Sequence, residues 1–171
     1  MPQLTAYIAA SFRHVHAARL LSRELRGLGY ELFDWTEQAK PPENLSAQER
    51  RTWMDTDHGG EVYSFCAMAC RTADLVIYLG ASGQDAGVEV GMARASGIPV
   101  LAVRGPLESP GLMLYGAADA WVESMDHALD ILRALPAELP DENEGASPLR
   151  PQLRQDAIRA IILHLAGGEM R

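Results

Sequence analysis

The chain has 171 residues, of which 47% are apolar and 22% are charged, and its formal net charge at pH 7 is −8. This length and composition predict one soluble globular domain with an apolar core. The acidic balance, without a stripe of Lys and Arg among aromatic residues, argues against nucleic acid as a partner. A membrane partner is not expected either, because no apolar run approaches membrane-spanning length.

The first half of the chain alternates apolar runs of strand length with amphipathic helical patterns. The expected elements are a strand over 4–10, a helix from residue 14 to Gly29, a strand over 30–35, a polar loop with two prolines over 36–50 and a helical stretch over 47–73. Glycines at 59 and 60 weaken this last stretch, so both one helix and two are compatible with it.

The second half begins with an unbroken apolar strand and ends with a helix. The elements are a strand over 74–79, a helix over 83–97, a strand over 98–103, a short strand over 120–123 and a helix over 124–135 that Pro136 should stop. Strands that alternate with helices indicate an α/β fold. Five strands suit a flavodoxin-like or Rossmann-like three-layer fold, with a parallel sheet in the order 2-1-3-4-5.

Three segments are expected along the chain: an α/β domain over 1–135, an acidic, proline-bearing linker over 136–151 and an amphipathic helix over 152–168. One side of that helix is apolar, with Leu153, Ile158, Ile161, Ile162 and Leu165. The apolar side must be covered, either by the domain itself or by a second subunit.

Ligands of such sheets bind at the carboxyl ends of the strands, between the first and third strands. The rule selects two loops, over 9–14 and over 80–89. In the first, Ser11 and Arg13 precede a helix, and a hydroxyl, a guanidinium and free N–H groups can together hold a phosphate. The competing interpretation is a helix-capping Ser11 and a surface Arg13.

The second loop carries glycines and polar residues just before a helix. Gly80 and Gly83 permit unusual backbone angles and the close approach of a ligand. Ser82 and Asp85 have the spacing of a capping box, with Asp in place of the usual Glu or Gln. The loop is therefore expected both to start the helix and to shape the ligand site.

Glu89 lies in the early turns of that helix, where the positive end of the helix dipole favours a carboxylate. Beside a ligand crevice, it could act as a nucleophile or stabilise a developing cation. A solvated surface glutamate is the equally weighted alternative. Small residues recur every four positions on the same helix and predict close packing against the sheet: Gly87, Gly91 and Ala95.

Several segments resemble the nucleoside 2-deoxyribosyltransferase superfamily, and the similarity spans roughly residues 4 to 135. The segments are "YIAASFR", "ADLVIYL", "DAGVEVGMA", "GIPVLAV" and "GLMLYGAADAW". The branch that they resemble most is the 2′-deoxynucleoside 5′-monophosphate N-glycosidases. The resemblance implies cleavage or transfer at an N-glycosidic bond, with a small nucleoside or nucleotide as substrate, no cofactor and a homodimer or larger assembly.

The resemblance also implies roles for individual residues. Glu89 would be the nucleophile that attacks the anomeric carbon, and Tyr7 a catalytic aromatic residue. Ser11 and Arg13 would hold the 5′-phosphate, and Asp85 and Gly87 would shape the sugar site. Phe12, Gly80 and Ser82, from the same two loops, complete the expected substrate-binding residues. Because family members form dimers that complete each other's sites, we expect the C-terminal helix to cover a second subunit.

One position departs from the family pattern. The family carries an Asp about two helical turns before the third strand, and here Cys66 lies near that place. Asp57, or its neighbours Asp55 and Glu61, could substitute if the helix bends at the two glycines, so Asp57 joins the expected catalytic residues. Without a substitute, a nucleotide-binding sensor is the alternative, and an NAD-glycohydrolase-type enzyme is a further one.

The chain has two cysteines, Cys66 and Cys70. Their spacing on a predicted helix favours two buried thiols over a disulfide, and no His/Cys cluster with zinc spacing accompanies them. The amino-terminal stretch lacks the basic and apolar regions of a signal peptide. We therefore expect a cytoplasmic protein that binds no metal.

Overall fold

The computed structural model of the chain describes residues 3–38, 45–139 and 151–167. Within them lies a five-stranded sheet in the order β2-β1-β3-β4-β5, and every neighbouring pair is parallel. The strands are β1 (Thr5–Ala9), β2 (Glu31–Phe33), β3 (Leu75–Leu79), β4 (Val100–Val103) and β5 (Ala120–Val122). The predicted α/β class and strand order are confirmed.

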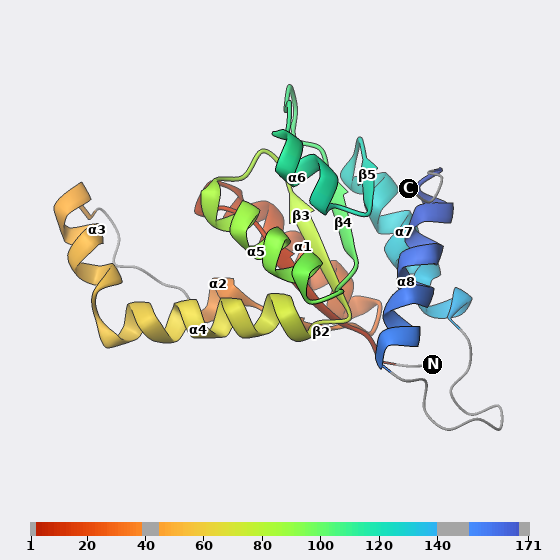
Figure 1. Cartoon of the computed structure of the whole chain (residues 1–171), viewed down its shortest axis with the longest axis horizontal. Helices are drawn as coiled ribbons and strands as arrows, with labels where there is room; N and C mark the ends of the chain where they lie inside the picture. Colours follow the sequence, from red (N-terminus) through yellow and green to blue (C-terminus); the bar gives the residue numbers. More distant parts are fainter. Residues whose placement is uncertain (1–2, 39–44, 140–150, 168–171) are drawn as a thin grey trace.

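The helices are η1 (Phe12–His14), α1 (Val15–Gly27), α2 (Trp35–Gln38), α3 (Ala47–Met54), α4 (Asp57–Thr72), α5 (Gln84–Ala95), α6 (Leu112–Ala117), α7 (Met125–Glu138) and α8 (Pro151–Leu165). Helices α4 and α5 cover one face of the sheet, and α1 and α7 cover the other (Figure 1). Both faces of the central strands are therefore covered, and every residue of β3 and β4 is buried. Their unbroken apolar sequences follow from this burial.

Helix α8 packs on its own domain, which corrects the expectation that it covers a second subunit. It lies against α7 (Figure 1), and the side chains of Ile158 and Ile162 are completely buried. Leu153, which belongs to the predicted apolar side, is 53% exposed. The amphipathic pattern shows that one side of the helix is buried. The same pattern is expected whether that side packs on a second subunit or on the chain's own domain.

Two arginines tie α8 to the amino-terminal edge of the sheet. The Arg159 guanidinium donates to Asp119 at 3.0 Å and to the backbone oxygen of Gly97 at 2.8 Å. Arg154 pairs with Asp74 at 3.2 Å. Asp74, Gly97 and Asp119 come shortly before β3, β4 and β5, so α8 lies at the edge opposite the strand ends that the ligand rule selects.

Two predicted boundaries are wrong for identifiable reasons. The strand predicted over 30–35 ends at Phe33, because the Asp34 carboxylate accepts hydrogen bonds from the Thr36 backbone and hydroxyl, and starts α2. Helix α7 continues through Pro136 to residue 138. A proline cannot donate to the carbonyl four residues earlier, and that carbonyl, of Leu132, instead accepts the Tyr30 hydroxyl at 2.7 Å.

The helical stretch over 47–73 consists of two helices that meet at Asp55 and Thr56, three to four residues before the glycine pair. The Thr56 hydroxyl caps α4 by accepting from the Gly59 amide. A Cβ at Gly59 would lie 2.7 Å from the carbonyl oxygens of Trp53 and Met54, so the turn from α3 to α4 needs a glycine there. Part of the loop predicted over 36–50 is helical, in α2 and α3, and residues 39–44 lie outside the described residues.

The linker predicted over 136–151 mostly lies outside the described residues, which resume at residue 151. Among the helices that the structure describes, none is long and apolar enough to cross a membrane.

Candidate active site

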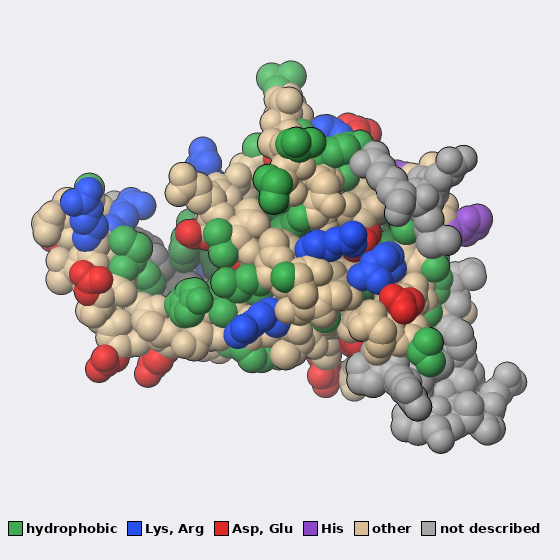
Figure 2. All heavy atoms as spheres, in the orientation of Figure 1, with side chains coloured by type: hydrophobic (Ala, Val, Ile, Leu, Met, Phe, Trp, Pro, Cys, Tyr) green, Lys and Arg blue, Asp and Glu red, His purple; other side chains and the backbone are tan. Residues whose placement is uncertain are grey.

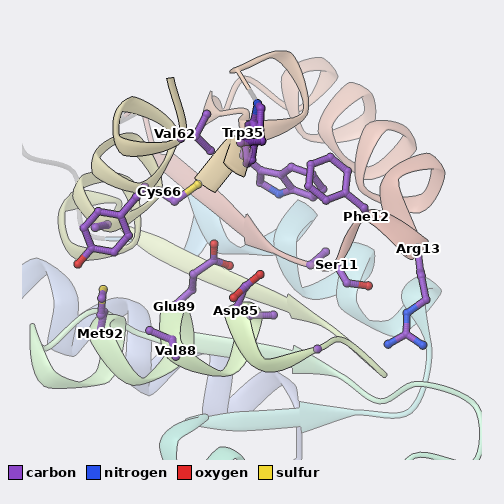
Figure 3. Close-up of a pocket in the computed structure, with 17 residues that line it drawn as sticks. Ser11, Phe12, Arg13, Trp35, Val62, Cys66, Asp85, Val88, Glu89 and Met92 are labelled. Atoms are coloured by element: carbon purple, nitrogen blue, oxygen red, sulfur yellow. The ribbon is translucent and has the colours of Figure 1, made fainter. Parts of the chain in front are cut away.

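A cavity of about 470 Å³ opens at the carboxyl ends of β1 and β3. Its walls come from the loop after β1, the loop and helix α5 after β3, and the inner side of α4 (Figure 3). The location agrees with the ligand rule for parallel sheets. Of the predicted site residues, the cavity is lined by Ser11, Phe12, Arg13, Asp85 and Glu89.

Glu89 is held by a hydrogen bond from the core of the protein. The Tyr7 ring, in the middle of β1, is completely buried, and its hydroxyl donates to Glu89 Oε1 at 2.6 Å. Glu89 lies in the second turn of α5. Its carboxylate faces the cavity, and one of its oxygens is held by the hydrogen bond from Tyr7 of β1 (Figure 3). The solvated surface glutamate of the alternative interpretation does not describe this arrangement.

The surroundings of Glu89 favour its protonated form more than water does. The pKa of Glu89 is raised to about 7, because burial and the negative charge of Asp85 raise it by more than the hydrogen bond from Tyr7 lowers it. Burial and the nearby Glu89 carboxylate raise the pKa of Tyr7 far above its ordinary value, so the phenol remains a donor. The carboxylate can therefore both ionise and take up a proton near neutral pH.

Asp85 is the second carboxylate of the cavity. It lies four residues before Glu89 on α5, so the two side chains share one face of the helix. Figure 3 shows the two carboxylates side by side in the middle of the cavity. No metal-binding group of three or more His, Cys, Asp or Glu occurs in the part of the chain that the structure describes.

Asp57 is not brought to this site. It is the first residue of α4, is exposed and does not line the cavity. Cys66 lies nine positions further along the same helix, which corresponds to about 13 Å along the axis. The bend between α3 and α4 precedes Asp57 and so does not carry it toward Glu89.

Cys66 occupies the wall of α4 that faces Glu89. It lines the cavity and lies near the Tyr7 hydroxyl. Burial raises the pKa of the Cys66 thiol, so the thiol is neutral at pH 7. Both Cys66 and Cys70 are free, with Cys70 buried and Cys66 half-buried.

Ser11 and Arg13 form one end of the cavity (Figure 3). The Ser11 hydroxyl oxygen is buried and has no hydrogen-bond partner among the described residues, and its side chain does not cap η1. Within residues 3–38, 45–139 and 151–167, Arg13 has no ion pair. An unpartnered hydroxyl and a guanidinium can together hold an anionic group.

Apolar and aromatic side chains form the rest of the wall, and the sequence reasoning missed most of them. The larger side chains that it missed are Trp35, Trp53, Val62, Tyr63, Val88 and Met92. Phe12, from the predicted set, meets Trp35 edge-on with ring centroids 5.0 Å apart. The Trp35 indole is fixed by donating to the Ile8 oxygen at 2.8 Å. Trp35 could have been predicted as a site residue, because it comes just after β2, at the edge of the sheet where ligands bind.

The loop after β3 differs from its prediction in two ways. Gly83 caps α5, and the Ser82 hydroxyl instead donates to the Leu79 oxygen, so the predicted capping box does not form. The stripe of small residues does not pack on the sheet either, because Gly91 and Ala95 are exposed. The buried face of α5 consists of Ala86, Val90 and Ala93. Neither Gly80, Ser82 nor Gly87 lines the cavity.

No family model and no curated protein matches this chain, but solved structures do. A 2-deoxyribosyltransferase from Bacillus psychrosaccharolyticus superposes with a TM-score of 0.53 at 20% identity, over 74% of this chain and 90% of its own. A conserved protein from Enterococcus faecalis V583 gives 0.58 at 17% identity, over 77% and 98%. The CMP N-glycosidase BcmB from Clostridium botulinum gives 0.47 at 15% identity, over 75% and 97%. The chain thus has the fold of a 2-deoxyribosyltransferase.

Proposed function

We propose that the protein is an enzyme that cleaves or transfers the N-glycosidic bond of a nucleoside 5′-monophosphate or nucleoside, with Glu89 as nucleophile. The observation that carries the proposal is the Glu89 carboxylate, fixed by Tyr7 at 2.6 Å in a largely apolar cavity. Cleavage of a glycosidic bond develops positive charge on the sugar, which a carboxylate close to the anomeric carbon stabilises. The fold shared with a 2-deoxyribosyltransferase supports the same chemistry.

The order of groups along the cavity matches the order of groups in a nucleotide. Met92 and Val88 lie toward one end, the carboxylates in the middle, and Ser11 and Arg13 toward the other end (Figure 3). The base would lie at the apolar end, the sugar beside Glu89, and the 5′-phosphate against the Ser11 hydroxyl and the Arg13 guanidinium.

The reaction would proceed in two displacements. The ionised Glu89 attacks the anomeric carbon, the carbon–nitrogen bond breaks, and its electron pair leaves with the base, which takes a proton from solvent. Water then attacks the same carbon, the ester bond to Glu89 breaks, and the carboxylate is restored. Asp85 would accept the proton that the water loses. A second base in place of water would give transfer instead of hydrolysis.

Base release separates this proposal from a sensor. Wild type, Glu89→Gln and the control Glu24→Gln, an exposed carboxylate on α1, are incubated with nucleosides, monophosphates and NAD, and free base is measured by chromatography. We expect release by wild type and the control and at least about a thousandfold loss in Glu89→Gln, as when a nucleophile is removed. Binding of a monophosphate without any release by wild type would contradict the enzyme and favour a nucleotide-binding module.

We also propose a homodimer, through a surface other than α8. Apolar side chains gather on the face formed by α4, α5 and α6 (Figure 2). Among them, Tyr63 is 64% exposed, Val88 55% and Met113 86%. Because Tyr63 and Val88 also line the cavity, a second subunit on this face would close the apolar end of the site.

We also propose a cytoplasmic location, on the state of the two cysteines alone. Both cysteines are free thiols, which is the state that a reducing compartment maintains. Labelling of the native and unfolded protein with a thiol reagent, after isolation under nitrogen, should find two thiols per chain.

A further inference from the structure

Three loops at the carboxyl edge of the sheet are joined by hydrogen bonds through Tyr78. This residue of β3 is 1% exposed, and its hydroxyl donates to Glu108 Oε1 at 2.7 Å. The same hydroxyl oxygen accepts from the backbone N–H of Ser82 at 3.1 Å. Glu108 lies in the segment between β4 and α6, so this segment is tied to the loop that leads into α5.

Ser82 continues the connection to the loop after β1. Its hydroxyl oxygen accepts from the backbone N–H of Ser11 at 3.0 Å and donates to the Leu79 oxygen. Glu108, Tyr78, Ser82 and Ser11 thus form one hydrogen-bond chain. Of these four residues, Ser11 alone lines the cavity.

The packing around Glu108 allows little freedom. Its other carboxylate oxygen accepts from the backbone N–H of Gly105 at 2.8 Å. There is no room for a Cβ at Gly80 or Gly105, because Glu108 and the two loops occupy that space. Beside them, Leu107 has a φ of 60° and a fully exposed side chain. A leucine in the left-handed region is unfavourable, and this turn is held by the bonds that Glu108 makes.

We infer that Tyr78 and Glu108 are positioning residues that hold Ser11, and with it the phosphate end of the cavity, without touching substrate. The inference rests on the proposed function in one respect, namely that Ser11 meets the phosphate. When the hydrogen-bond chain is intact, the backbone N–H of Ser11 is held by Ser82. Ser11 then lines the cavity, and within the described residues its buried hydroxyl oxygen has no partner. When the hydrogen-bond chain is broken at Tyr78, the backbone N–H of Ser82 loses its acceptor. The bond from the Ser11 N–H to the Ser82 hydroxyl, across 71 positions of sequence, is then held less firmly, and Ser11 is less well placed.

The first test measures the hydrogen-bond chain without any substrate. Tyr78→Phe keeps the buried ring but removes both bonds of the hydroxyl. Followed by NMR hydrogen exchange, the amide of Ser11 is expected to exchange about tenfold faster in this variant, while amides inside β1 keep their rates. Unchanged exchange at Ser11 would overturn the inference.

The second test compares ligands with and without a phosphate. By calorimetry, Tyr78→Phe and Glu108→Ala should bind a 2′-deoxynucleoside 5′-monophosphate about two- to tenfold more weakly, as for the loss of one hydrogen bond, and the matching nucleoside equally well. Glu108→Gln, which keeps one acceptor oxygen, should lie between. In substrate cleavage the loss should appear in KM and leave kcat within about twofold of wild type.

The control is Glu123→Gln, which changes an exposed carboxylate at the same edge that pairs with Arg104 at 2.9 Å, and it should bind both ligands as wild type does. An equal loss for both ligands in Tyr78→Phe, or no loss, would overturn the inference. A wild type that binds both ligands equally well contradicts the proposed phosphate site instead. In that case the exchange rate of the Ser11 amide alone tests whether Tyr78 and Glu108 hold Ser11.

Discussion

Replacement of Glu89 by Gln should stabilise the protein at alkaline pH. Burial raises the pKa of Glu89 from 4.5 to about 7, so the folded protein binds more protons than the unfolded chain between these two pH values. Stability from this group is therefore complete below about pH 4.5 and is lost as the pH rises through about 7. At pH 8.5 the buried charge costs about 3 kcal/mol, and at pH 5 less than about 1 kcal/mol. Glutamine carries no charge at either pH.

Urea unfolding followed by circular dichroism measures this difference directly. Relative to wild type, Glu89→Gln should gain about 3 kcal/mol at pH 8.5 and less than about 1 kcal/mol at pH 5. All other titrating groups are common to both proteins, so they cancel in the comparison. The same difference at both pH values, or a less stable variant at pH 8.5, would refute the argument that burial raises the pKa of Glu89.

Four further outcomes follow from named contacts. Tyr7→Phe removes the hydrogen bond that lowers the pKa of Glu89, so the acidic limb of the kcat/KM profile should move to higher pH; an unmoved limb contradicts this. Arg13→Ala should weaken monophosphate binding about ten- to a hundredfold by calorimetry, and nucleoside binding hardly at all. Ile162→Ala, at a completely buried position of α8, should lower the free energy of unfolding in urea by about 2–5 kcal/mol. A change near zero would contradict the packing of α8 on the core. Val88→Asp should convert the dimer to a monomer in light scattering, and a monomeric wild type would exclude the dimer.

The sheet could be predicted because its signals are local. An unbroken apolar run such as 75–79 suits a strand covered on both faces, and the alternation with helices sets the class of fold. The ends of the helices and strands were harder to predict, because they depend on contacts between residues that are distant in the sequence. Helix α7 continues through Pro136 because the Leu132 carbonyl, which the proline leaves without a donor, accepts a hydrogen bond from the Tyr30 hydroxyl. Tyr30 is 102 positions away in sequence, so no local pattern predicts this contact.

The site divides in the same way. Glu89 could be singled out from its place after a strand and from a resemblance, but its raised pKa comes from burial and from the charge of Asp85, which outweigh the lowering hydrogen bond from Tyr7 and which only the folded chain supplies. Asp57 was expected in the site as a substitute for the family's helix Asp, on condition that the helix bends at the two glycines, and the structure leaves it exposed. The apolar side of α8 was recognised, yet periodicity shows that a face is covered and does not show by what.

The central claim is that the Glu89 carboxylate forms a bond to the sugar. Wild type mixed with a 2′-deoxynucleoside 5′-monophosphate is quenched in acid within milliseconds to seconds, digested and analysed by mass spectrometry. We expect a deoxyribose 5-phosphate adduct on the peptide that contains Glu89, and none in Glu89→Gln. An adduct on a different residue, or release of free base by Glu89→Gln at the wild-type rate, would contradict it.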